Sequence, residues 1–327
     1  MLSVASRRLL NTSFIRSFSV RIDKLCQTGI LPEGNTSAYY GIYNLDYQKI
    51  STPEGRKQLV DAISGFHDLL KNTSDELRTS IVGNISFGKK AWTTLTQNNE
   101  ELKNTGDKLI DFPGYGSAPS TQTDIYLHIH SKKDFATFEA AKLAINSFNK
   151  ESPIMKVVDE KDGFVYKDSR DLTNFIDGTE NPHGMQPRIS AGLTEKGESY
   201  TMVQRFIHNL PKWEKVSVSE QESVIGRTKP DSVQLHPVPV NSHVGRTDVK
   251  ENGKGLKIVR QSLPYGAPGS EMGLWFTAYC HDLHNIIEIE KSMFGERDNI
   301  TDRILEFITP VTGAFFFTPS LEQLKKL

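Results

Sequence analysis

The order of its expected strands and helices constrains the fold of this chain more than any other feature. Strands are expected where apolar residues alternate or form short runs, and helices where apolar residues recur at helical spacing. In the first half, the order strand, helix, strand, strand, helix, strand occupies residues 37–47, 54–72, 77–87, 123–131, 133–150 and 154–167. In the second half, the same order occupies residues 197–210, 217–228, 255–266, 271–282, 283–295 and 313–320.

This duplicated β-α-β-β-α-β order predicts an α+β protein built as a tandem ferredoxin-like repeat, with antiparallel sheets and helices on the outer faces. We place the two domains at residues 21–170 and 171–327. The offset of roughly 150 residues between equivalent elements indicates an internal repeat, although the halves share the pattern rather than the sequence. A fold of this kind does not define a chemistry.

Composition excludes several classes of protein. Hydrophobic residues make up 37% of the 327 residues and charged residues 24%, which is typical of a soluble globular protein. No apolar run approaches the ~18 residues of a membrane span, and the net charge of −1 provides no basic excess for binding nucleic acid. The only cysteines, Cys26 and Cys280, exclude a disulfide framework and a multi-cysteine metal site.

Residues 1–20, MLSVASRRLLNTSFIRSFSV, differ from the rest of the chain in composition. They contain Arg7, Arg8 and Arg16, five serines and no acidic residue. This composition is typical of a mitochondrial transit peptide, although the amphipathic pattern is imperfect because Arg7 intrudes on the apolar face. The alternative is a disordered N-terminal tail. We therefore expect a mitochondrial protein, located in the matrix.

Nine histidines are candidate metal ligands. His128 and His130 share one face of an expected strand, but a zinc site needs three or four ligands and no cysteine or acidic partner is near them in the sequence. His243 lies in the polar segment VNSHVGRTD, ahead of the expected strand at 255–266. On the residues alone, a surface histidine is the simpler interpretation of His243.

The stretch FIDGTENP at 175–182 holds a carboxylate, Asp177, among residues that favour turns. It is either an ordinary loop or a loop that holds Asp177 rigidly over a reactant. The segment IDGT also resembles half of the Asp-x-Asp-Gly-Thr signature of haloacid dehalogenase phosphatases. That interpretation fails because the nucleophile position is occupied by Phe175, which cannot attack phosphorus.

Three longer segments carry a resemblance to a known family. They are DGFVYKDSRDLTNFIDGTENP at 162–182, NSHVGRTDVKENGKGLKIVRQSLPYG at 241–266, and the segment from GLWFTAYCHD to FFFTPS at 273–320. The chain resembles the dye-decolorizing (DyP-type) haem peroxidases, and most closely their bacterial-type P (B) subgroup. The family fold is a tandem ferredoxin-like domain, which agrees with the repeat. The family motif Gly-x-x-Asp-Gly here begins with Asn174, a residue type that tolerates a left-handed backbone.

The resemblance implies one haem b per chain, with His243 as the axial ligand of the iron. It implies that Asp302, on a C-terminal helix, holds the second imidazole nitrogen of His243. On the opposite face of the haem, Asp177 would carry a proton between the oxygens of hydrogen peroxide. Arg260 would stabilise the charge that develops as the O–O bond breaks and leaves an oxoferryl species. Ser262 would hydrogen-bond to peroxide or to a water molecule.

The resemblance also implies further haem contacts. Gly178, Thr179 and Glu180 follow Asp177 at positions where related enzymes touch the haem. Arg246 could pair with a haem propionate, and an ordinary solvated arginine is an equal alternative. Phe276 could roof the distal pocket, although an aromatic residue on a strand more often belongs to the core.

The implied activity is a peroxidase that reduces hydrogen peroxide and oxidises dyes, phenols or similar small reductants. Because an unperturbed carboxylate has a pKa near ~3.9, an acidic pH optimum is expected. Electrons from bulky reductants could pass through surface aromatic residues such as Trp213, Trp275 or Tyr265. The family also implies a homo-oligomer. The alternative function is a haem-binding or haem-handling protein whose peroxidase activity is incidental.

Overall fold

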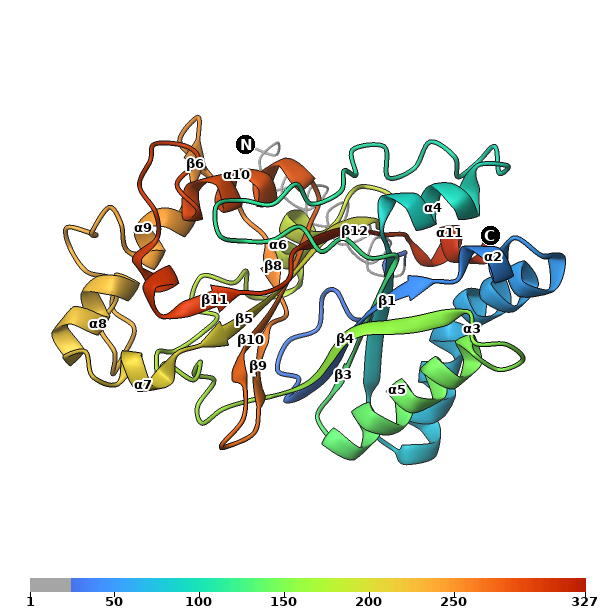
Figure 1. The fold of residues 1–327 in the computed structure, drawn as a ribbon, viewed down its shortest axis with the longest axis horizontal. Coiled ribbons are helices and arrows are strands. Elements are labelled where there is room, and N and C mark those ends of the chain that lie inside the picture. Colours follow the sequence, from blue (N-terminus) through green and yellow to red (C-terminus); the bar gives the residue numbers. More distant parts are fainter. Residues whose placement is uncertain (1–24) are drawn as a thin grey trace, which may run out of the picture.

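The computed structural model describes residues 25–327, so the expected transit peptide at 1–20 lies outside the described residues. Each half forms a ferredoxin-like unit, as predicted (Figure 1). The first unit contains β1 Ser37–Leu45, α3 Pro53–Leu77, β2 Ile81–Phe87, β3 Ile125–Ser131, α5 Asp134–Phe148 and β4 Met155–Phe164. The second contains β5 Ser199–His208, α8 Val218–Ile225, β8 Val259–Arg260, β9 Leu263–Gly266, β10 Met272–Cys280, α10 Leu283–Met293 and β12 Ala314–Thr318.

Shorter elements that the sequence patterns did not predict occupy the connections. They are α2 Tyr47–Ile50, α4 Lys89–Thr96, α6 Met185–Gly192, α7 Leu210–Trp213, α9 His243–Thr247, β6 Lys250–Glu251, β7 Lys254–Gly255, the 3₁₀ helix η1 Arg303–Glu306, β11 Ile308–Pro310 and α11 Leu321–Lys325. The single strand expected at 255–266 is wrong in detail. It is divided into β7, β8 and β9, and both β8 and β9 pair with β10. No helix within residues 25–327 combines the length and the apolar character needed to cross a membrane.

The longest helix, α3, shows why these elements begin and end where they do. The Thr52 hydroxyl accepts a hydrogen bond from the Gly55 amide at 3.1 Å, and Pro53 occupies the first turn, where its missing N–H costs nothing. Arg78 ends the helix with a left-handed backbone at φ 50°. The buried apolar face of α3 then covers the outer face of the first sheet, beside α5.

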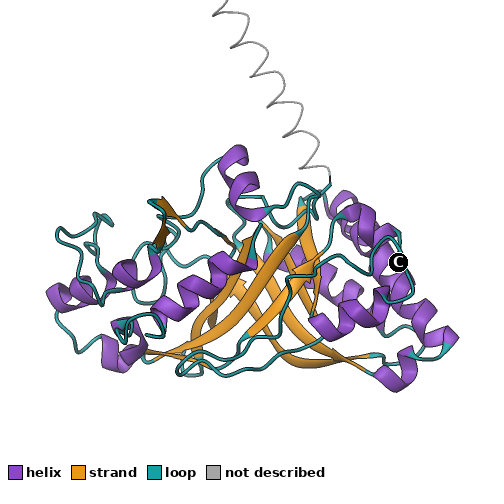
Figure 2. Cartoon of the chain, turned by 90° about the horizontal axis from the view of Figure 1, so that it is seen from above, coloured by secondary structure: helices purple, strands orange, loops and turns teal. Residues whose placement is uncertain are grey.

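The two sheets join into one closed sheet. In each half the strands lie in the ferredoxin-like order, β4-β1-β3-β2 and β12-β5-β10-β9. The halves join where Gly163 of β4 pairs with Tyr265 of β9, and where Phe87 of β2 pairs with Phe317 of β12. Eight strands therefore form a ring, namely β5, β12, β2, β3, β1, β4, β9 and β10, which pairs with β5 again. Figure 2 shows these strands in the middle of the molecule with helices on either side.

Strand alternation gives the closed sheet an inner and an outer face. The inner face is filled by side chains such as Tyr40 of β1, Tyr126 of β3, Trp275 of β10 and Phe316 of β12, all of which are fully buried. A ring of eight strands is about the size whose interior side chains alone can fill. The outer face is covered by α3 and α5 in the first half and by α10 in the second, with α9 packed against α10. The second of these layers contains the cavity described below.

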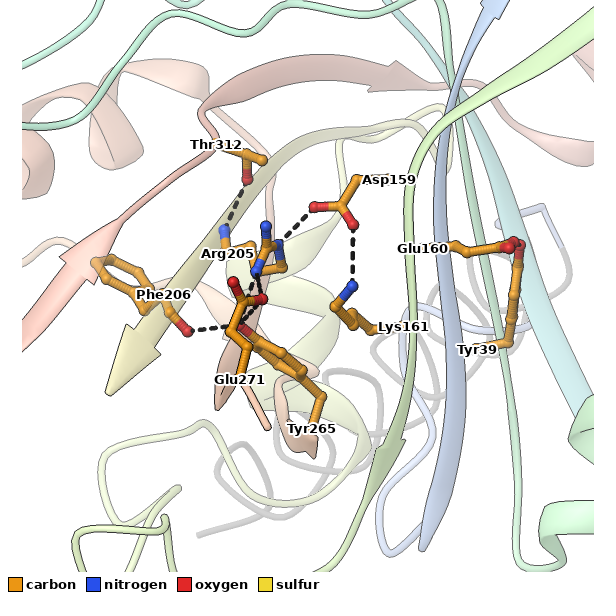
Figure 3. A network of polar contacts seen from close by, with 9 residues as sticks. All are labelled: Tyr39, Asp159, Glu160, Lys161, Arg205, Phe206, Tyr265, Glu271 and Thr312. Carbon is orange, nitrogen blue, oxygen red and sulfur yellow. Dashed lines mark hydrogen bonds and ion pairs between the residues drawn. The ribbon is translucent and has the colours of Figure 1, made fainter. Parts of the chain in front are cut away.

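A polar network crosses from one half to the other (Figure 3). The Arg205 guanidinium of β5 donates to Asp159 of β4 at 2.5 Å, to the Tyr265 hydroxyl at 2.8 Å and to Glu271. The Arg205 amide donates to the Thr312 hydroxyl at 2.8 Å. Since one guanidinium connects strands of both ferredoxin-like units, the network fixes the halves relative to each other.

Candidate active site

A cavity in the second half lies between the outer face of β5 and β10 and the helices α9 and α10. Most of its wall is apolar, with side chains that include Leu256, Ile258, Leu274, Phe276, Ile289 and Met293. His243, Asp177, Arg260 and Ser262 line the same cavity. The structure therefore brings together four of the residues singled out from the sequence, although they come from three separate segments of the chain.

His243 is held by a buried carboxylate. It is the first residue of α9, a turn that begins where the Ser242 hydroxyl accepts the Gly245 amide at 3.1 Å. The His243 Nδ1–H donates to Asp302 Oδ2 at 2.7 Å, since a carboxylate accepts and does not donate. In the neutral form of the imidazole, Nε2 then carries no proton and can bind a metal. One third of the His243 side chain is exposed, against none of Asp302, and the exposed part lines the cavity.

The resemblance implied that Asp302 lies on a C-terminal helix, and this expectation is wrong. Asp302 precedes the 3₁₀ helix η1 and caps it, because its Oδ1 accepts the Ile304 amide at 2.9 Å. The next amide, of Arg303, donates to the Asn241 carbonyl at 3.0 Å and so ties this turn to the start of α9. The two carboxylate oxygens of Asp302 thus have separate tasks, one for the backbone and one for His243.

The charges around His243 act on its pKa in both directions. Burial lowers the pKa, but the charge of Asp302 and its hydrogen bond raise it, and the net shift is upward. Arg260 lowers the pKa of His243 and Asp177 raises it, both through charge. Asp177 and Arg260 therefore lie close enough to influence the imidazole electrostatically.

The loop that carries Asp177 turns as the sequence suggested. Asn174 adopts a left-handed backbone, with φ 66°, in the place of the first glycine of the family motif. The next glycine, Gly178, has φ 84°, and nothing lies within 4 Å of the position that its Cβ would occupy. Glycine is therefore needed at 178 for its backbone conformation rather than for lack of space. The Gly178 amide donates to Asp177 Oδ1 at 2.6 Å, which orients the carboxylate.

Arg260 is fixed to the same loop by a residue that sequence reasoning missed. The Asn181 side chain accepts the Arg260 amide at 2.9 Å and donates to the Arg260 carbonyl at 2.9 Å. The Arg260 guanidinium lies 3.8 Å from Asp177 Oδ1. Asn181 thereby holds the loop of Asp177 and the strand of Arg260 together. The available signal was its amide, which offers a donor and an acceptor beside the carboxylate in FIDGTENP.

Ser262 interrupts the strand between β8 and β9. Its hydroxyl accepts the Thr277 amide at 3.0 Å and lies 3.5 Å from the Thr277 carbonyl, a long contact that leaves its proton weakly held. Phe276 lines the same cavity.

The remaining expected contacts divide into two groups. Glu180 lines the cavity and forms ion pairs with Arg227 and, at 3.7 Å, with Lys257. Thr179 instead forms a hydrogen bond with Ser232 and is not part of the cavity wall. Gly178 also lies outside this wall. 

Arg246 is buried and away from the cavity wall. Its guanidinium binds Asp298 through two hydrogen bonds, at 2.7 and 3.0 Å, and donates to the Ser292 carbonyl. Its observed partner is therefore a carboxylate of this chain, and the arginine ties α9 to α10. The sequence could not reveal this pair because its members lie 52 residues apart.

Four polar side chains on the cavity wall were not expected. Asp171 Oδ1, Gln204 Oε1 and Nε2 and Glu290 Oε2 are buried and lack a hydrogen-bond partner, and His208 Nδ1 has only a contact of 3.6 Å with Asp171 Oδ2. Burial raises the pKa of Glu290 to about 8. Buried polar atoms without partners indicate a site that is completed by a bound molecule.

The aromatic residues considered for electron transfer are not on the surface. Trp213, Trp275 and Tyr265 are 2%, 0% and 0% exposed, so the interpretation as surface aromatics is wrong. His128 and His130 lie inside the closed sheet, and no group of three or more potential ligands for a metal ion occurs among residues 25–327.

Comparison with known proteins gives a consistent result. The family models for the N-terminal and C-terminal parts of Dyp-type peroxidases match residues 15–165 and 168–323. A dye-decolorizing peroxidase of Mycobacterium tuberculosis is 35% identical over 282 residues, which are 81% of this chain and 78% of that protein. One of Rhodococcus erythropolis is 32% identical over 295 residues, 83% of this chain and 82% of the relative.

Solved structures agree with these relatives. A dye-decolorizing protein from V. cholerae is 40% identical, with a TM-score of 0.83, and the match covers 92% of this chain and 99% of that one. DyPB from Rhodococcus jostii RHA1 is 31% identical, with a TM-score of 0.82, over 91% of this chain and 97% of that one. Variants of the R. jostii protein were solved in complex with heme. The fold, the cavity and these relatives together place the chain in the dye-decolorizing (DyP-type) peroxidase family.

Proposed function

We propose that His243, Asp177 and Arg260 carry the haem-dependent peroxidase reaction of this family in this chain. The observation that carries the proposal is the Nδ1–Oδ2 bond of 2.7 Å between His243 and Asp302. It leaves Nε2 of His243 as a metal ligand in the same cavity as a carboxylate and a guanidinium. An anionic partner makes an imidazole a stronger electron donor, which favours the oxidised iron that peroxidases use.

The residues of the cavity fit a haem. Its apolar side chains suit the porphyrin ring, His243 suits the iron, and Lys257 at the wall suits a propionate. Arg246 is not assigned a propionate, because both of its terminal nitrogens are bound to Asp298. The haem supplies the iron to which peroxide binds and the capacity to hold oxidising equivalents.

The chain supplies the proton transfer and the charge. Asp177 Oδ1 accepts the Gly178 amide, which leaves Oδ2 to take a proton from one peroxide oxygen and to return it to the other. The guanidinium of Arg260 stabilises the negative charge that develops on the departing oxygen. Ser262, whose hydroxyl has only a long contact of 3.5 Å with the Thr277 carbonyl, donates a hydrogen bond to peroxide or to water. Asn181 holds the loop of Asp177 next to the strand of Arg260 and so keeps the carboxylate and the guanidinium close to each other.

The proposal is tested with protein purified in the presence of haem. The wild type should show the Soret absorption of bound haem and should oxidise a dye when peroxide is added. His243→Ala should lose normally ligated haem. A His243→Ala variant that keeps the wild-type spectrum and turnover would show that another residue binds the iron.

A second candidate function is haem handling. Deferrochelatases of Shigella species are 26% identical over 182 residues, which are 45% of this chain and 42% of those proteins. The peroxidase relatives match over a much larger share of both chains, and a distal acid with a cation serves peroxide chemistry rather than storage. Fast turnover of peroxide with a dye would support the peroxidase, whereas slow turnover with ready release of haem would support the carrier.

The similarity to R. jostii DyPB supports assignment to the P (B) subgroup, with a small-molecule reductant such as a dye or a phenol. We also propose a homo-oligomer and a mitochondrial location, the latter from the composition of residues 1–20. A fusion of residues 1–25 to a fluorescent reporter should enter mitochondria, and a diffuse cytosolic signal would contradict this. Sedimentation analysis of the purified protein tests the oligomer, and a monomer at micromolar concentration would exclude it.

A further inference from the structure

The interior of the closed sheet contains a stack of aromatic rings that the peroxide site does not use. The ring centroids of His130 and His128 are 4.4 Å apart, and their planes are inclined by 3°. The corresponding values are 5.0 Å and 18° for His128 and Tyr40, and 5.5 Å and 7° for Tyr40 and Trp275. All four side chains are buried. The Tyr279 ring is also nearly parallel to that of His128, at 14° and 6.1 Å. 

Hydrogen bonds to the backbone fix the direction of the donors around Tyr279. The Gly29 amide donates to Asn84 Oδ1 at 3.0 Å, which orients the Asn84 side chain. Asn84 Nδ2 then donates to the Tyr279 hydroxyl at 2.9 Å. Because the phenol oxygen already accepts this bond, its own proton points to Nδ1 of His128, also at 2.9 Å. Tyr279 is thus a phenol that donates to an imidazole base.

The imidazole of His128 is able to accept that proton. Burial, with a further contribution from His130, lowers the pKa of His128, so the ring is neutral in the resting protein. His130 is neutral as well, because its Nε2–H donates to the Gly29 carbonyl at 3.0 Å while its Nδ1 accepts from Asn35. The pair of Tyr279 and His128 therefore begins as a neutral phenol and a neutral base.

Tyr279 lies directly behind the wall of the haem cavity. Side chains alternate along β10, so that Leu274 and Phe276 line the cavity while Trp275, Thr277 and Tyr279 face the interior. The neighbouring residue, Ala278, pairs with Arg260. A second pocket also connects the two regions, because Tyr40, His128 and His130 of the ring stack line it together with Asp177 and Arg260.

We propose that Tyr279 is a redox-active residue that stores one oxidising equivalent delivered by hydrogen peroxide, a role that rests on the peroxidase function. Peroxide takes two electrons as its O–O bond breaks; Tyr279 would supply one of them through the haem, and the haem itself would supply the other. As that electron leaves, the O–H bond of Tyr279 breaks and its proton moves to Nδ1 of His128. The products are a neutral phenoxyl radical and an imidazolium. An electron from the reducing substrate, with return of the proton, restores the pair.

Tyr40 and Tyr126, the two other tyrosines whose rings stack against His128, lack such a base. The Tyr40 hydroxyl donates to the Gln261 carbonyl at 2.9 Å, and that of Tyr126 bonds to the Thr277 hydroxyl at 2.6 Å. Neither a carbonyl nor an alcohol can take up the proton of an oxidised phenol. The acceptor at Nδ1 of His128 therefore singles out Tyr279 among the three.

The test is electron paramagnetic resonance of the haem-loaded protein, frozen rapidly after one equivalent of peroxide is added without a reductant. A phenoxyl radical should appear, and growth on ring-deuterated tyrosine should narrow its signal. Tyr279→Phe should abolish this signal while the Soret absorption of bound haem remains. Tyr126→Phe, which removes a phenol without a base, is the matched control and should keep it. His128→Asn should greatly reduce the yield of the radical.

Three outcomes would overturn the proposal. They are a signal that ring-deuterated tyrosine leaves unchanged, a signal that persists in Tyr279→Phe, and a wild-type protein that consumes peroxide without forming any protein radical. The deuteration experiment uses the wild type, so it decides the matter even where a variant fails to fold. Failure to bind haem or to react with peroxide would instead contradict the proposed function itself.

Discussion

Asp302→Asn is the substitution that tests the candidate site most directly. The structure gives the two oxygens of Asp302 separate donors, the Nδ1–H of His243 at 2.7 Å and the Ile304 amide at 2.9 Å. An asparagine has only one oxygen, so its NH2 group must face one of these donors. Since Asp302 is 1% exposed, water cannot replace the lost acceptor. A hydrogen bond to a charged group contributes about 1.5–3 kcal/mol, and each 1.4 kcal/mol is a factor of about ten.

We therefore expect Asp302→Asn to weaken haem binding or the reaction with peroxide about 10–100-fold, the usual effect of losing a partner of a metal-bound histidine. Haem affinity is measured by titrating the haem-free protein and following the Soret absorption, and the peroxide reaction by stopped flow. Asp298→Asn is the matched control, because Asp298 lies four residues earlier but binds Arg246 rather than His243. Equal losses in both variants, or none in Asp302→Asn, would refute the role given to the buried carboxylate.

Four further substitutions test other parts of the site. Arg260→Leu is expected to slow the peroxide reaction at least as much as Asp177→Ala, each by about 10²–10⁴-fold in stopped-flow measurements, and a near-normal rate in either variant would contradict its role. Asn181→Ala should also slow this reaction while the haem content is unchanged, because both bonds that hold the Arg260 backbone are lost. For Glu290, whose pKa in the folded protein is about 8 against an ordinary 4.5, the folded state holds a proton that the unfolded state has released. The haem-free protein should therefore lose stability as pH rises from about 5 to about 8, by up to about 5 kcal/mol, and Glu290→Gln should remove this dependence in urea unfolding. Parallel pH profiles of the two proteins would contradict the buried neutral carboxyl.

The order of the elements could be predicted because it depends on local patterns. The apolar face of α3 and the alternation in β3 are visible within a few turns or residues of sequence. Closure of the sheet could not be predicted in this way. It depends on two contacts between distant residues, Gly163 with Tyr265 and Phe87 with Phe317, and no local period distinguishes these positions from other strand residues.

In the candidate site, too, some features could be predicted from the sequence and others depend on contacts between distant residues. The resemblance named Asp177, Arg260 and His243, and the structure places all three on one cavity wall. It could not show that Arg246 is bound by Asp298, because that pairing depends on the fold of this chain. Gln204 was also missed, although it shares a strand face with Phe206, and a polar residue in line with buried apolar ones is a usable signal.

His128 illustrates how the closed sheet changes the meaning of a residue. In the sequence, His128 and His130 are two polar residues on one face of a strand, which suggests water or a metal. In the closed sheet that face is the interior, where a charged imidazole is costly and a neutral one is retained. A neutral imidazole next to a phenol can accept a proton from it, whereas a protonated imidazole cannot. The same closure places the cavity on the other side of β10, so that one strand presents Phe276 to the peroxide site and Tyr279 to the interior. Proton transfer to peroxide by Asp177 and proton transfer from Tyr279 to His128 therefore use separate acceptors, which is why substitution of Tyr279 or His128 should leave the reaction with peroxide working.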